Sequence, residues 1–78
     1  MIQKRYAQFR RKLTSLLESG QAQGVIRADI PADLLADQVC AIGDGWAMMF
    51  PVEPERFGRG RIHDLVNAAM AMLAPQER

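Results

Sequence analysis

A chain of 78 residues has room for a single domain, and a fold of this size buries only about 60% of the surface that its unfolded chain exposes. Hydrophobic residues make up 49% of the sequence and charged residues 24%, which excludes the disordered and fibrous classes, and the net charge is only +1. The single cysteine, Cys40, excludes the several disulfides that stabilise small secreted domains. No segment has the roughly 18 consecutive apolar residues of a membrane span or the apolar core of a signal peptide. We therefore expect a cytoplasmic protein without membrane contact.

The first predicted element is a long amphipathic helix over about residues 2–23. Apolar or small residues recur there every three or four positions and form one stripe, which consists of Ile2, Tyr6, Phe9, Leu13, Leu16 and Gly20. Gly24 follows, and glycine readily adopts the positive φ that ends helices. The next two residues, Val25 and Ile26, are predicted to form an apolar plug in a tight connection.

A second helix is predicted over about residues 32–50, because Pro31 suits a helix start and Pro51 with Pro54 disfavours continuation. Its large apolar stripe consists of Leu35, Val39, Ile42, Trp46 and Met49, with Phe50 beside it. A row of small residues lies about 100° around the helix from this large stripe. It consists of Ala36, Cys40, Gly43 and Ala47. Another backbone can approach closely along this row, so the second helix is expected to have two neighbours.

The loop after the second helix is rich in proline, and Phe57 is expected to anchor it. A third helix is predicted over about residues 59–74, with Pro75 at its end. Its apolar residues keep helical spacing and are Ile62, Leu65, Val66, Ala69, Met72 and Leu73. No alternating strand pattern is present, so the predicted fold is all-α, with three helices in an antiparallel arrangement.

Three helices of this length enclose a thin core, and part of their apolar surface requires cover. A second copy of the chain can cover this apolar surface by symmetry. The last two helices then pair with the same two helices of the partner and form a four-helix bundle. We therefore predict a homodimer. The predicted interface consists of Leu35, Val39, Ile42, Trp46, Met49, Phe50, Ile62, Val66, Ala69 and Leu73. The alternative is that these side chains form an ordinary core within one chain.

Several motifs, taken in order, resemble a known family. Residues 17–30 combine a helix end, a glycine, a hydrophobic pair, an arginine and an aspartate, and an Asp-Gly pair follows at Asp44 and Gly45. Residues 54–57 and the apolar last helix complete a resemblance to the C-terminal part of TetR-type transcriptional regulators, in their BetI-like subgroup. The resemblance implies a ligand-responsive repressor domain whose last two helices dimerise and whose earlier helices line an effector pocket.

A complete regulator of this family also has an N-terminal helix-turn-helix domain, which these 78 residues lack. We therefore interpret residues 1–78 as a partial effector-binding and dimerisation domain that does not bind DNA directly by itself. Three alternatives for the nature of the chain remain open. It is a gene fragment, a truncated reading frame or a stand-alone partner that modulates a full-length regulator. A further alternative is a nucleic-acid or membrane-surface binder that uses the basic residues of the first helix, Lys4, Arg5, Arg10, Arg11 and Lys12.

No catalytic, metal or cofactor site is predicted. His63 is the only histidine, and Cys40 has no basic neighbour to activate it. Three aspartates of the second helix, Asp33, Asp37 and Asp44, are interpreted as a solvated face. If a small apolar effector binds, we expect it between the two helices at Tyr6, Phe9, Leu13 and Trp46.

Overall fold

The computed structural model of the chain describes residues 2–76, with side chains from Lys4 onward. It contains helix α1 (Ile2–Ala22), helix α2 (Ala32–Val52), a 3₁₀ turn η1 (Pro54–Arg56) and helix α3 (Arg59–Leu73). No strand occurs in this part of the chain, so the predicted all-α class is confirmed, and each predicted helix lies within two residues of its observed bounds.

The end of α2 differs from the prediction. The helix continues through Pro51 to Val52, and the N–H of Glu53 still donates to the carbonyl oxygen of Met49 at 3.0 Å. A proline removes one N–H donor and its ring crowds the carbonyl group four residues earlier, but in the last turn of a helix few further hydrogen bonds depend on continuation. Pro51 therefore does not end α2 at residue 50, and the chain turns only at Glu53.

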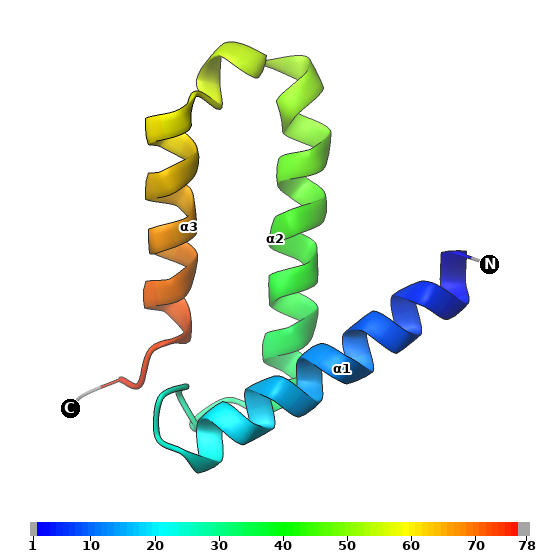
Figure 1. The fold of residues 1–78 in the computed structure, drawn as a ribbon, viewed down its shortest axis with the longest axis vertical. Coiled ribbons are helices and arrows are strands. Elements are labelled where there is room, and N and C mark those ends of the chain that lie inside the picture. The colour runs from blue at the N-terminus through cyan, green and yellow to red at the C-terminus, as the bar shows by residue number, and fades with distance from the viewer. Residues whose placement is uncertain (1, 77–78) are drawn as a thin grey trace.

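Helices α2 and α3 form an antiparallel hairpin closed by η1, and α1 crosses the opposite end of α2 obliquely (Figure 1). The molecule measures 39 × 38 × 15 Å, so it is little more than one helix thick. Its radius of gyration is 14.1 Å, whereas a compact chain of this length is expected to have about 11.5 Å. Both broad faces of the hairpin are therefore left largely without a second layer.

The core lies where α1 crosses α2. Its buried side chains are Leu17, Ala32, Leu35 and Ala36, and Leu13, Ile26, Ile30 and Leu73 pack against them. Ala36 is fully buried, because the predicted row of small residues lets α1 approach α2. The stripe predicted for α1 was wrong at Leu16, which is 67% exposed, whereas Leu17 is 6% exposed. The side chain of Ile2 lies outside the described residues.

The connection between α1 and α2 folds back on the end of α1. Gly24 has φ of +80°, as predicted for the residue after the helix, and the N–H groups of Val25 and Ile26 both donate to the carbonyl oxygen of Gly20. Ile26 packs on the core as expected, while Val25 is 62% exposed. Only one half of the predicted apolar plug is therefore inserted.

Candidate functional site

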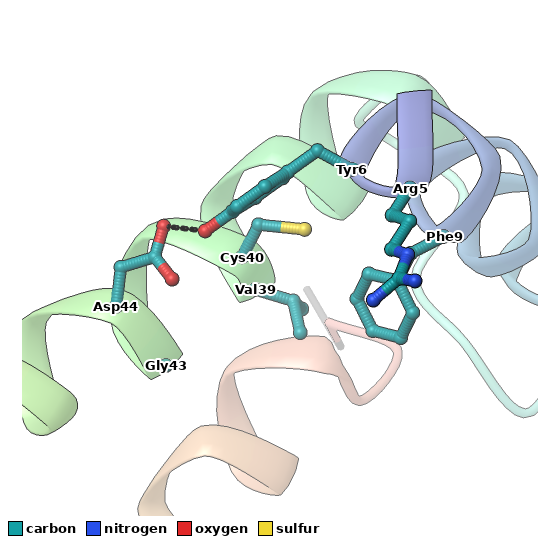
Figure 2. A pocket seen from close by; sticks show the side chains of 7 residues that line it. All are labelled: Arg5, Tyr6, Phe9, Val39, Cys40, Gly43 and Asp44. Atoms are coloured by element: carbon teal, nitrogen blue, oxygen red, sulfur yellow. Dashed lines mark hydrogen bonds between the residues drawn. The ribbon is translucent and has the colours of Figure 1, made fainter. Parts of the chain in front are cut away.

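The first candidate site is a groove between α1 and α2, here called the α1–α2 groove. Its volume is about 470 Å³. The residues that line it are Arg5, Tyr6, Phe9, Val39, Cys40, Gly43 and Asp44, as Figure 2 shows. Two of them, Cys40 and Gly43, belong to the row of small residues on α2. Because α1 diverges from α2 toward its N-terminus, these small residues leave an open space there instead of a tight contact (Figure 1).

A hydrogen bond closes one end of this groove. The Tyr6 hydroxyl donates to the Asp44 carboxylate across the two helices (Figure 2). This hydrogen bond raises the pKa of Tyr6 above its ordinary value, with smaller contributions from desolvation and from the negative charge of Asp44. Asp44 was interpreted from the sequence as part of a solvated face, but it lies one helical turn after Cys40, on the side of α2 that faces α1. That spacing was the signal for its place in the groove.

The four residues predicted to hold an effector do not lie together. Tyr6 and Phe9 line the α1–α2 groove, whereas Leu13 packs on the core. Trp46 lies on the side of α2 that faces α3. Sequence reasoning omitted Val39, Cys40 and Gly43 from this site, although the last two were already singled out as a surface for close approach.

A second groove lies between α2 and α3, here called the hairpin groove, with a volume of about 580 Å³. It contains seven of the ten residues predicted for the dimer interface: Leu35, Val39, Ile42, Trp46, Val66, Ala69 and Leu73. Phe50 and Ile62 line a smaller cavity at the closed end of the hairpin, next to Phe57. The tenth residue, Met49, lies in neither cavity and is 45% exposed.

The hairpin exposes many large apolar side chains. On α3 these are Ile62, Val66, Met70 and Met72, and α2 adds Leu34, Met48, Met49, Phe50 and Val52. At the closed end, the rings of Phe50 and Phe57 lie 5.9 Å apart, and Phe57 is buried, as expected for the loop anchor. Large exposed apolar surfaces on soluble proteins are typical of surfaces that bind a protein, a membrane or a ligand.

The remaining polar side chains that the structure describes are not buried. His63 is exposed and lies near Asn67 and Asp64, and within residues 4–76 no three histidine, cysteine or acidic side chains are grouped to hold a metal ion. Arg10 of the basic set pairs with Asp37 at 3.9 Å, on the surface. None of the helices described is long and apolar enough to cross a membrane.

The chain is a small all-α domain, a single layer of helices with an exposed apolar hairpin. The family comparison then gives its identity, because residues 1–75 match the family described as BetI-type transcriptional repressor, C-terminal. The chain belongs to this family, whose members are domains of transcriptional regulators and not enzymes. No curated protein and no solved structure matches the chain.

Proposed function

We propose that this domain is the homodimerisation module of a transcriptional repressor and that it associates through the open face of the α2–α3 hairpin. The observation that carries the proposal is the accessible surface of 6356 Å². A compact monomer of 8.7 kDa exposes about 4,700 Å². The excess of roughly 1,600 Å² falls in the range of roughly 1,000–2,500 Å² that each subunit of an obligate homodimer buries.

A second copy is the occupant that best suits this face. An antiparallel hairpin that meets its own copy about a twofold axis gives a four-helix bundle in which the same residues serve both sides. The hairpin groove contains one charged residue, Arg27, at its open end, and its other side chains are apolar apart from Gln38. Such a surface has little charge to desolvate when a partner covers it.

The test compares the solution mass of the chain with that of two charge variants across a dilution series, by light scattering. Val66→Glu places a carboxylate in the hairpin groove, whereas Leu16→Glu places one on an exposed apolar position of α1 that lines none of the three cavities above. We expect a dimer that Val66→Glu disrupts and Leu16→Glu retains. Circular dichroism of both variants checks that the helices persist. A wild-type chain that stays monomeric at all concentrations would overturn the proposal.

We further propose that the α1–α2 groove is part of the effector site and takes a small apolar molecule. Two aromatic rings, Tyr6 and Phe9, and the aliphatic side chain of Val39 supply the apolar walls. The Asp44 carboxylate stands at the edge and can accept one hydrogen bond from a ligand donor in addition to that from Tyr6. The groove is open on one side, so only part of such a ligand is covered by this chain.

Indole is a suitable probe, because it is an apolar ring with one N–H donor and no charge. We expect saturable shifts in the NMR signals of Tyr6, Phe9 and Cys40, and weaker binding to a Phe9→Ala variant. Leu13 serves as the internal control because its side chain packs on the core and does not line the groove. Shifts that are equal over the whole apolar surface, or absent at Tyr6 and Phe9, would count against an effector site here.

A further inference from the structure

The open end of the hairpin is held by one residue of the connection, Arg27. Its backbone N–H donates to the carbonyl oxygen of Leu73 at 2.8 Å, and its side-chain Nη1 donates to the carbonyl oxygen of Met72 at 3.3 Å. These are carbonyls of the last turn of α3, which have no partner within the helix. A positive charge at this position also favours the negative end of the helix dipole.

Arg27 is itself held on both sides. Its Nε and Nη2 atoms donate to the two carboxylate oxygens of Asp29, each at 2.7 Å, in the paired geometry that only a guanidinium offers. The side-chain amide of Gln21, at the end of α1, donates to the carbonyl oxygens of Arg27 at 3.0 Å and Ile30 at 2.8 Å. The Arg27 side chain is 21% exposed and the Asp29 side chain is 55% exposed, so solvent reaches this pair mainly from the carboxylate side.

No other residue of α1, the connection or α2 hydrogen-bonds to α3 within the described residues 4–76. The apolar contact at this end is small as well, since Leu73 is the only α3 side chain packed on the core. Toward the middle of the hairpin, the hairpin groove separates α2 from α3. The position of α3 relative to α1 therefore depends on few contacts, and Arg27 makes all the polar ones.

We propose that Arg27 is a positioning residue that fixes the C-terminal end of α3 to the end of α1 and thereby sets the hairpin geometry on which dimerisation depends. The effect on dimerisation rests on the function proposed above, whereas the fixing of α3 stands independently. Loss of the Arg27 side chain leaves α3 held by the closed end of the hairpin, by the backbone bond to Leu73 and by the packing of the Leu73 side chain on the core. The hairpin then samples wider openings, and the dimer must order it again at a cost in affinity.

Hydrogen exchange of the residue 27 amide measures this arrangement directly, because that N–H bonds to the carbonyl oxygen of Leu73 whatever the side chain. The full 78-residue chain is compared with Arg27→Ala and Arg27→Lys, and Arg56→Ala is the matched control. Arg56 forms a surface pair with Glu53 at 3.6 Å at the closed end of the hairpin, away from this contact. Circular dichroism monitors helix content, and light scattering gives the dimer dissociation constant.

We expect Arg27→Ala to accelerate exchange at residue 27 and to raise the dimer dissociation constant, each by about tenfold, as the loss of a charged hydrogen bond predicts. Arg27→Lys should fall between this variant and the wild type, because lysine keeps the charge but not the paired geometry, and it gives the same test if Arg27→Ala does not fold. Arg56→Ala should change neither quantity. Unchanged exchange at residue 27 in a folded variant would overturn the proposal, whereas faster exchange with unchanged dimer affinity would overturn its link to dimerisation. A wild-type chain that is monomeric throughout would overturn only the dimerisation part, since the exchange readout does not require a dimer.

Discussion

The Tyr6 hydroxyl and the Asp44 carboxylate form a hydrogen bond that joins the N-terminal part of α1 to the middle of α2. The core holds only the far end of α1, around Leu17. Apart from the surface pair of Arg10 and Asp37, the Tyr6–Asp44 bond is the polar contact that keeps the described part of α1 beside α2. The width of the α1–α2 groove therefore depends on it.

Replacement of Asp44 by asparagine is expected to lower the pKa of Tyr6 toward its ordinary value. The carboxylate raises this pKa in the folded chain, so the bond contributes to stability fully below a pH of about 10 and the contribution is lost as the pH rises through the raised value. The chain has one tyrosine, so the ultraviolet absorbance of tyrosinate reports Tyr6 alone. Asp37→Asn is the control on the same helix, and an unchanged titration in Asp44→Asn would show that the carboxylate does not act on Tyr6.

The core prediction concerns two adjacent leucines of α1. Leu17→Ala is expected to lower the free energy of unfolding by about 2–5 kcal/mol, because Leu17 is 6% exposed and its loss leaves a cavity between α1 and α2. Leu16→Ala, at 67% exposure, is expected to change it by less than about 0.5 kcal/mol. Urea unfolding at one protein concentration measures both. The reverse order would mean that α1 packs through the stripe predicted from its sequence.

This pair also shows what the sequence determines and what it does not. Helical periodicity, Gly24 and the proline positions were sufficient for three helices and their order, because these are local preferences of the chain. The side of α1 that becomes buried depends on the angle at which it crosses α2. Local spacing carries no information on that angle, so Leu16 was chosen in place of Leu17.

The candidate site was predictable to a similar extent. The row of small residues on α2 indicated where another helix could approach, and the aromatic residues of α1 indicated what that helix would bring. Trp46 was assigned to the same site because of its size, although it lies about 120° around α2 from Cys40 and lines the hairpin groove instead. Asp44 was left out because an isolated aspartate is usually solvated, and only the crossing of α1 brings Tyr6 to it.

Gly20 is a glycine whose lack of a side chain the packing of α1 requires. A β-carbon at this position would collide with the side chain of Ile26, which packs over the end of α1. Gly20→Ala is expected to lower the free energy of unfolding by about 1–3 kcal/mol through overpacking. Gly60→Ala on α3, where a β-carbon meets no atom within 4 Å, is the control and is expected to raise it by up to about 1 kcal/mol. Thermal unfolding of the two variants distinguishes steric conflict from helix propensity, and a stabilised Gly20→Ala would show that the connection is not packed against α1.

Gly43 lines both the α1–α2 groove and the hairpin groove, whereas its neighbour Gly45 lines neither. A β-carbon at either position meets no atom within 4 Å, so alanine is tolerated at both, and each variant is expected to gain about 0.5–1 kcal/mol of stability from helix propensity. The methyl group at residue 43 enters the space beside Tyr6 and Phe9, so Gly43→Ala is expected to weaken indole binding, while Gly45→Ala leaves it unchanged. Thermal unfolding and the NMR titration with indole measure the two effects separately. Equal indole affinity in both variants would mean that the probe does not reach the floor of the α1–α2 groove, and the effector site would then have to be sought elsewhere on the domain.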